Sequence, residues 1–132
     1  MILVDTSVWI DYLNNLDTPQ SLLLGTGLRR NMVLVGDLVL TEILQGIRSD
    51  RQFDDIRRIL ALLPQLRICD DNVCVAAAHN FRRLRSLGIT ARGTVDTLIA
   101  TRCIVDGHAL LFRDKDFAPF VAHLGLRDAM SE

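Results

Sequence analysis

Apolar residues along this chain fall into two alternating patterns. Short runs dominated by apolar residues predict buried β-strands, and longer stretches with apolar residues at helical spacing predict amphipathic helices. The short runs lie at 1–4, 32–35, 66–69 and 109–112, with a weaker one at 126–129. Buried strands separated by helices favour a parallel sheet that helices cover on both faces. The pattern therefore predicts an α/β protein with a central parallel sheet of four to five strands.

Capping and breaking residues set the limits of the predicted helices. The helices are expected at 8–16, 19–30, 37–47, 50–63, 70–87, 94–106 and 117–124. Asp37, Asp50 and Thr94 are the expected N-caps of three of them, because a short polar side chain can accept a hydrogen bond from the first turn. Gly88 and Gly107 are expected to end two of them.

The size and composition of the chain indicate one folded domain. Its 132 residues fit a single domain, 1–132, and a hydrophobic share of 49% is enough for a buried core. No apolar run approaches the roughly 18 residues of a membrane helix, and Asp5 interrupts the N-terminus before a signal-like stretch can form. We therefore expect a soluble, cytoplasmic protein with no membrane partner. The three cysteines form no CxxC pair and the three histidines lie far apart, so zinc chemistry is not expected.

Acidic residues follow two of the predicted strands. Asp5 comes directly after the first strand, and Asp114 and Asp116 come shortly after the fourth. In parallel sheets the functional site lies beyond the carboxyl ends of the strands, so these carboxylates are expected to share one edge. Ordinary capping roles are also open: Asp5 could cap the next helix, although Thr6 or Ser7 could do so equally well, and Asp116 could cap the last helix.

Two further acids belong to predicted helices. Asp96 shares one helix face with Ile99 and Ala100, so it heads a stripe that points into the protein. An interaction with the helix dipole, worth about 0.3–1 kcal/mol, would explain an acid in the first turn, but it would not explain an acid on the apolar face. Glu42 borders the buried face of its own helix, although glutamate is also a good helix former at exposed positions.

Carboxylates that converge at one sheet edge repel one another. Two of them about 4 Å apart cost on the order of 4 kcal/mol at an effective dielectric constant near 20, so such a cluster either takes up protons or binds a cation. An all-carboxylate site suits Mg²⁺, for which Mn²⁺ can substitute, and such an ion allows phosphodiester hydrolysis without a side-chain nucleophile. The chain contains no glycine-rich dinucleotide or Walker-type loop, which argues against nucleotide-cofactor and NTPase functions.

Two other classes of protein with acidic pockets fit less well. A phosphoacceptor receiver domain needs a lysine at the end of a late strand, whereas the only lysine, Lys115, lies between two aspartates. A phosphatase of the DxDx type needs a second acid at the position that Ser7 occupies. Neither pattern is met.

Four segments of the chain are familiar when taken together: MILVDTSVWIDYL at the N-terminus, LTEILQG at 40–46, TVDTLIA at 94–100 and LFRDKDF at 111–117. They resemble the corresponding segments of PIN-domain ribonucleases, and within that family those of the VapC toxins of VapBC toxin–antitoxin pairs. The segments occur in the order and spacing of the family, and the resemblance extends over the whole chain. The resemblance implies a three-layer α/β/α PIN-like domain.

The same resemblance implies a Mg²⁺- or Mn²⁺-dependent endoribonuclease that acts as the toxin of such a pair. The implied catalytic and metal-binding residues are Asp5, Glu42, Asp96 and Asp114. Asp116 would be a more distant or secondary metal ligand, and Ser7 would donate a supporting hydrogen bond near the metal. The implied partners are an RNA substrate (tRNA, rRNA or mRNA), a VapB-type antitoxin with a C-terminal segment that enters the active-site groove, and a second copy in a homodimer.

Arginines near the acidic positions suggest how RNA is bound. The net charge is only −1, but 14 of the 15 basic residues are arginine, a ratio that a GC-rich genome could also produce. We predict that Arg92 and Arg113 contact RNA phosphates, while the arginines at 82–85 fit better as the solvated face of a helix. The alternative to an enzyme is a catalytically silent PIN-like module that binds RNA or a partner. Loss of one of the four acids would indicate it, and all four are present.

Overall fold

The central sheet is parallel throughout. The computed structural model describes residues 1–91 and 93–132. Five strands form one sheet in the order β3-β2-β1-β4-β5, and each neighbouring pair runs parallel. The strands are β1 (Ile2–Val4), β2 (Val33–Gly36), β3 (Gln65–Leu66), β4 (Ala109–Leu111) and β5 (Arg127–Asp128). The predicted sheet of four to five parallel strands is therefore confirmed, including the weak strand near the C-terminus.

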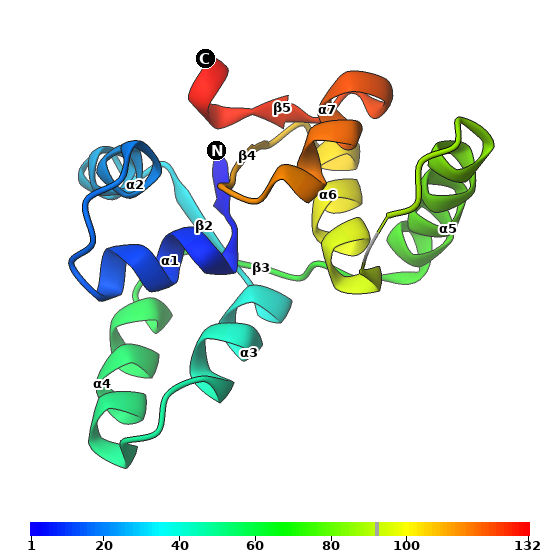
Figure 1. Ribbon diagram of the computed structural model, residues 1–132. Helices are drawn as coiled ribbons and strands as arrows, with labels where there is room; N and C mark the ends of the chain where they lie inside the picture. The colour runs from blue at the N-terminus through cyan, green and yellow to red at the C-terminus, as the bar shows by residue number, and fades with distance from the viewer. Residues whose placement is uncertain (92) are drawn as a thin grey trace.

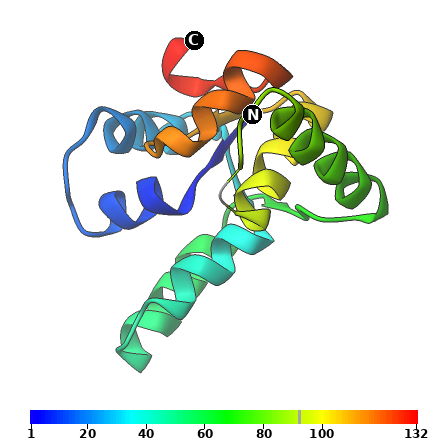
Figure 2. The same ribbon diagram turned by 45° about the vertical axis from the view of Figure 1, so that its right-hand side comes forward.

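Helices connect the strands and cover the sheet from two sides. They are α1 (Thr6–Leu13), α2 (Pro19–Arg29), α3 (Asp37–Gln45), α4 (Asp50–Ala61), α5 (Asp71–Ser86), α6 (Thr94–Asp106) and α7 (Ala118–Leu124), with the short 3-10 helices η1 (Lys115–Phe117) and η2 (Ala129–Ser131). Figure 1 shows α1 and α2 on one side of the sheet and α5, α6 and α7 on the other, which gives three layers. In Figure 2, α3 and α4 extend together away from the rest of the domain.

The two central strands place their carboxyl ends side by side. Leu3 and Val4 of β1 and Leu110 and Leu111 of β4 are fully buried, as expected for strands with helices on both faces. Val4 lies beside Leu111 in the register of the sheet. The chain segments that leave β1 and β4 therefore begin next to each other, and they carry the acids that follow these strands.

The predicted strand at 66–69 is mostly wrong, because β3 ends at Leu66. Beyond Leu66, the backbone N–H and carbonyl of Ile68 form hydrogen bonds with side chains instead of with a neighbouring strand. Its N–H donates to Asp37 Oδ1 at 3.0 Å, and its carbonyl accepts from Arg102 Nε at 3.0 Å. The Ile68 side chain is fully buried over Gly36, where a Cβ atom would lie only 2.8 Å from it. An apolar side chain is thus buried here without sheet pairing, which the sequence pattern does not distinguish from a strand.

In three helices the N-cap is the residue before the one that we predicted. Asp37, Asp50 and Thr94 are the first helical residues rather than the N-caps. Ser49 caps α4 by accepting a hydrogen bond from the Gln52 N–H at 3.3 Å. The correction is small, since a short polar residue inside the first turn and one just before it have similar sequence signatures.

The predicted ends of two helices are confirmed. Gly88 follows α5 with a φ of +80°, and Gly107 ends α6 with a φ of +73°. Glycine adopts this left-handed conformation without the steric penalty that a Cβ atom would bring. Within residues 1–91 and 93–132, no helix has both the length and the apolar content needed to cross a membrane.

Candidate active site

Asp5 enters the site because it directly follows the central strand β1. Its backbone N–H donates to the Leu111 carbonyl at 2.9 Å, which continues the pairing of β1 with β4 by one residue. Asp5 occupies the N-cap position of α1, but its side chain makes no capping hydrogen bond within the described part of the chain. Asp5 is 6% exposed, and its Oδ2 accepts a hydrogen bond from the Ser7 hydroxyl at 3.1 Å. Ser7 therefore supports Asp5 directly.

The pKa of Asp5 reflects this burial. Desolvation raises the pKa above its usual range, and the charge of the nearby Glu42 raises it further. The hydrogen bond from Ser7 acts in the opposite direction, because it favours the charged carboxylate. Asp5 and Glu42, 37 positions apart in the numbering, are therefore close enough in the fold to repel each other.

Asp96 is repelled by the charges of the other four acids of the site. It lies in the first turn of α6 and is half-buried. Its pKa is raised to about 6, first by burial and then by the carboxylates of Asp5, Glu42, Asp114 and Asp116. A carboxylate that is surrounded in this way either holds a proton or needs a cation near it.

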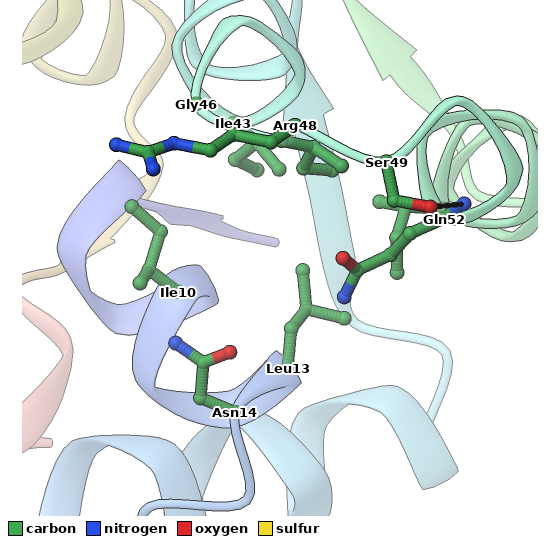
Figure 3. Close-up of a pocket in the computed structure, with 10 residues that line it drawn as sticks. Ile10, Leu13, Asn14, Ile43, Gly46, Arg48, Ser49 and Gln52 are labelled. Atoms are coloured by element: carbon green, nitrogen blue, oxygen red, sulfur yellow. Dashed lines mark hydrogen bonds between the residues drawn. The ribbon is translucent and has the colours of Figure 1, made fainter.

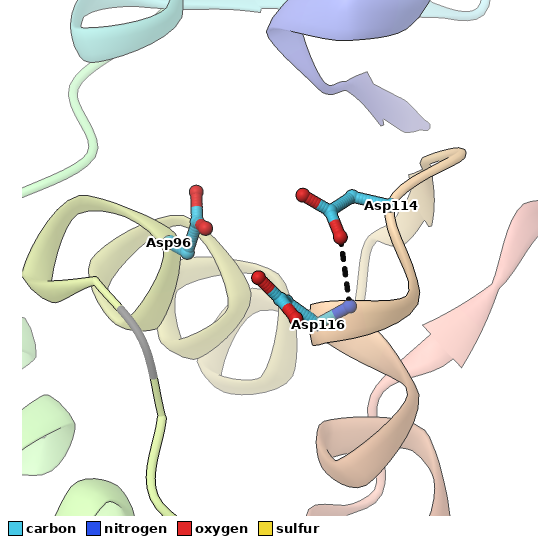
Figure 4. Close-up of side chains that lie close together, drawn as sticks. All are labelled: Asp96, Asp114 and Asp116. Carbon is cyan, nitrogen blue, oxygen red and sulfur yellow. Dashed lines mark hydrogen bonds between the residues drawn. The ribbon is translucent and has the colours of Figure 1, made fainter.

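Asp114 and Asp116 complete a compact cluster with Asp96. One carboxylate oxygen from each of the three lies within 4.8 Å of the others. Figure 4 shows Asp96 on α6, Asp114 on the turn before η1 and Asp116 on η1. Asp114 Oδ1 accepts the Asp116 N–H at 2.9 Å and so caps η1. Asp116, predicted as a possible cap of the last helix, does not take that role: the N-cap of α7 is Phe117, with no side-chain capping hydrogen bond among the described residues. The Asp116 carboxylate joins the cluster instead.

Glu42 approaches the cluster from α3. Its Oε1 accepts a hydrogen bond from the Thr6 hydroxyl at 2.7 Å. Glu42 does not belong to the compact group of three carboxylates, yet its charge acts on both Asp5 and Asp96. Thr6 belongs to the site, although its sequence position suggested only a helix cap. Its place directly after Asp5 is the feature of the sequence that could have indicated this role.

The predicted RNA-binding arginines have different outcomes. Arg92 lies outside the described residues. Arg113 Nε lies 2.9 Å from Asp11 Oδ2, so its guanidinium is engaged in an ion pair with α1. The arginines at 82–85 are exposed on α5, as expected for a solvated face.

The donor set fits a hard divalent cation. The site gathers Asp5, Glu42, Asp96, Asp114 and Asp116 at the carboxyl edge of β1 and β4. All of their ligand atoms are carboxylate oxygens, the type that Mg²⁺ and Mn²⁺ prefer. The raised pKa of Asp96 is what an acidic site shows before a cation balances it.

A groove borders two of the helices that build the site. It has a volume of about 410 Å³ and lies between α1, the end of α3 and the start of α4. Figure 3 shows Ile10 and Leu13 of α1 facing Ile43 of α3 across it, with Arg48 and Gln52 at its rim. Ile43 directly follows Glu42 on α3, but none of the five acids of the site lines the groove.

Comparison with known proteins places this geometry in a family. The PIN domain family model matches residues 2–120. Two curated relatives are the VapC ribonuclease Mb1587 of Mycobacterium bovis and the ribonuclease VapC11 of Mycobacterium tuberculosis. Each is 31% identical over 119 residues, which cover 89% of this chain and 89% of the relative.

Solved structures share the fold at lower identity. The FitAcB structure from Neisseria gonorrhoeae has a TM-score of 0.75 at 17% identity and covers 100% of this chain and 99% of that one. VapBC-1 from nontypeable Haemophilus influenzae gives 0.74 at 16% identity with full coverage of both chains, 100% and 100%. VapBC2 from Rickettsia felis, bound to a promoter DNA fragment, gives 0.73 at 19% identity with 96% coverage of each. The expected three-layer α/β/α fold is confirmed, and this chain belongs to the PIN-domain family, with VapC ribonucleases among its relatives.

Proposed function

We propose that this protein is a divalent-metal-dependent endoribonuclease that acts as the toxin of a toxin–antitoxin pair. The observation that carries the proposal is the convergence of carboxylates from β1, α3, α6 and the β4–η1 turn at one edge of the sheet. Family membership and relatives named as VapC ribonucleases support RNA as the substrate class.

The acids of the cluster have distinct parts in this proposal. Asp96, Asp114 and Asp116 would hold the ion together with Asp5, because the first three already bring oxygens within 4.8 Å of one another. Glu42 would complete the negative site from α3. Once bound, Mg²⁺ or Mn²⁺ would supply Lewis acidity toward the phosphodiester and lower the pKa of a water molecule.

Two hydroxyl groups fix the carboxylates in place. Ser7 holds Oδ2 of Asp5, and Thr6 holds Oε1 of Glu42. Each acid therefore has one anchored oxygen, and we assign the other oxygen to the ion. This anchoring orients the ligands before the ion binds, as hydrogen-bonding partners commonly do for metal-binding side chains.

The partner side of the proposal rests on the groove beside the site. The structural neighbours are complexes named VapBC and FitAcB, and we propose a VapB-type antitoxin as the partner of this chain. The groove between α1, α3 and α4 is lined by apolar and polar side chains, and one of the apolar ones, Ile43, directly follows Glu42 on α3. An antitoxin segment lying there could continue into the acidic site and block it. We further propose a cytoplasmic location and a homodimer.

The direct test is RNA cleavage with matched variants. Purified, antitoxin-free protein is incubated with a pool of tRNA and rRNA in Mg²⁺, in Mn²⁺ and in EDTA. Asp5→Asn and Asp96→Asn should each lower cleavage by at least about 100-fold, the equivalent of about 3 kcal/mol in the barrier. Asp54→Asn, at an exposed position on α4, should cleave like the wild type.

The outcomes separate the enzyme from the silent binding module. Cleavage that requires metal and disappears in both site variants supports the ribonuclease. Failure of folded wild-type protein to cleave any RNA in the pool, combined with Mn²⁺ binding that Asp96→Asn abolishes, would point to a narrow target absent from the pool. Failure to cleave together with no metal binding would contradict the proposal.

A further inference from the structure

An ion pair between a buried carboxylate and a half-exposed arginine joins α1 to the segment that carries the acids after β4. Arg113 Nε lies 2.9 Å from Asp11 Oδ2, and the Asp11 side chain is only 9% exposed. Oδ2 itself is buried and accepts no hydrogen bond among the described residues. The positive charge of Arg113 therefore offsets the cost of burying the negative charge of Asp11.

The burial of Asp11 constrains what Arg113 can do. A buried carboxylate without a nearby cation or hydrogen-bond donor is strongly unfavourable. Moving Arg113 outward to an RNA phosphate would leave Asp11 in that state. Although the Arg113 side chain is 52% exposed, its guanidinium is tied to α1. The pairing therefore argues against the RNA contact that the sequence suggested.

The pair lies where two acid-bearing segments leave the sheet. Asp5 begins α1, and its N–H is bonded to the carbonyl of Leu111 at the end of β4. Arg113 follows two residues after Leu111 and directly precedes Asp114. The ion pair with Asp11 therefore attaches the turn that contains Asp114 to α1, the helix that Asp5 precedes.

The position of this turn determines where Asp114 and Asp116 lie relative to Asp96. Asp114 Oδ1 accepts the Asp116 N–H at 2.9 Å, so a hydrogen bond joins the two residues. In Figure 4 the Asp114 side chain projects from the turn toward Asp96 and Asp116. A shift of the turn would separate Asp114 and Asp116 from Asp96, which α6 holds independently.

We propose that Arg113 and Asp11 are positioning residues, which hold Asp114 and Asp116 in register with Asp96 for metal binding. This inference rests on the proposed metal-dependent function and adds two residues outside the acidic cluster to it. Positioning partners of metal ligands typically change metal affinity or activity by about 10–100-fold when they are removed.

The first measurement is metal affinity, which does not depend on RNA cleavage. Mn²⁺ is titrated into the metal-free protein and followed by electron paramagnetic resonance. Arg113→Ala and Asp11→Asn should each weaken Mn²⁺ binding by about 10-fold or more. The double variant should lose no more than either single variant, because both remove the same contact. Arg113→Lys should recover part of the affinity, since it keeps the charge but not the guanidinium geometry.

Folding is controlled within the same set. The double variant leaves no buried charge unpaired, and Phe117 remains buried against Phe112 and Phe120 to anchor η1. Circular dichroism of the double variant should therefore match the wild type. The matched control is Arg58→Ala, which breaks an ion pair with Asp55 at 3.1 Å whose side chains are 75% and 52% exposed. Its Mn²⁺ affinity should be unchanged.

The second measurement separates positioning from RNA contact. Binding of fluorescein-labelled tRNA is measured by anisotropy in EDTA between 50 and 200 mM salt. A residue that contacts a phosphate contributes about 0.7–1 to the slope of log affinity against log salt. Arg113→Ala should leave this slope unchanged. A lowered slope with wild-type Mn²⁺ affinity would overturn the proposal and restore Arg113 as an RNA contact.

The two proposals fail in different ways. A wild-type protein that neither cleaves RNA nor binds Mn²⁺ would contradict the ribonuclease, and the positioning role, which rests on the same metal site, would be contradicted with it. Wild-type Mn²⁺ affinity in both Arg113→Ala and Asp11→Asn would overturn the positioning role and leave the ribonuclease untouched.

Discussion

Replacing Asp96 with asparagine should stabilise the metal-free protein at neutral pH, although it removes a ligand of the site. Asp96 is half-buried, and burial together with the neighbouring carboxylates raises its pKa from the usual value of 3.8 to about 6. In the folded protein the group therefore binds a proton over a pH range in which the unfolded chain has released it. Stability is present at low pH and is lost as the pH rises through the folded pKa.

The size of this effect follows from the difference between the two pKa values. One pKa unit corresponds to about 1.36 kcal/mol, so the full difference sets an upper limit of about 3 kcal/mol at pH 7. Solvent around a half-exposed carboxylate screens the repulsion, and we expect about 1–2 kcal/mol. Asparagine keeps the shape of the side chain and has no charge to lose.

The assay is urea unfolding in EDTA at several pH values between 4 and 7.5. Asp96→Asn should be more stable than the wild type at pH 7.5, and the difference should shrink as the pH falls through 6 toward 4. The comparison with the wild type is essential, because Asp70, whose pKa is lowered mainly by its hydrogen bond from the Val73 N–H, changes stability in the opposite direction. That contribution is the same in both proteins and cancels.

Two results would refute the reasoning. One is a difference between the variant and the wild type that stays constant from pH 4 to 7.5. The other is a variant that is less stable than the wild type at pH 7.5 in EDTA. Mn²⁺ provides an internal check, since an ion at ten times its Kd adds about 1.4 kcal/mol to the wild type and should add much less to Asp96→Asn. Asp54→Asn serves as the control.

Three further predictions concern other contacts. Thr6→Val should lower RNA cleavage by about tenfold, because it removes the hydroxyl that donates to Glu42 at 2.7 Å, and Thr6→Ser should restore it; equal rates for both variants would exclude this role. Arg102→Met should lower the free energy of unfolding by about 3 kcal/mol in urea titrations, because Arg102 is 8% exposed and pairs with Asp70 at 2.8 Å; a change below about 1 kcal/mol would contradict this. Ile10→Glu should weaken binding of the antitoxin in pull-down or calorimetric assays and leave RNA cleavage unchanged, because Ile10 is exposed in the groove of about 410 Å³; unchanged antitoxin binding would place the partner elsewhere.

The sequence alone determined the type and order of the seven α-helices in the described part of the chain, and of most of the strands. Buried parallel strands must be apolar on both faces, so the runs around Leu3 and Leu110 identify strands without any knowledge of their neighbours. The same logic places Asp5 and Asp114 at one edge, because each follows a strand and parallel strands end together. Asp96 was recognisable because a carboxylate on the apolar side of a helix has no ordinary structural role.

Only the tertiary structure decided which side chains meet. The segment around Ile68 looks like a strand, but Asp37 and Arg102 occupy its backbone groups. The place of Arg113 beside Asp114 predicts an RNA contact, and only the fold reveals that its Nε lies 2.9 Å from a buried carboxylate on α1. Sequence periodicity reports which face of an element is buried, whereas a long polar side chain takes its partner from whatever the fold brings within reach.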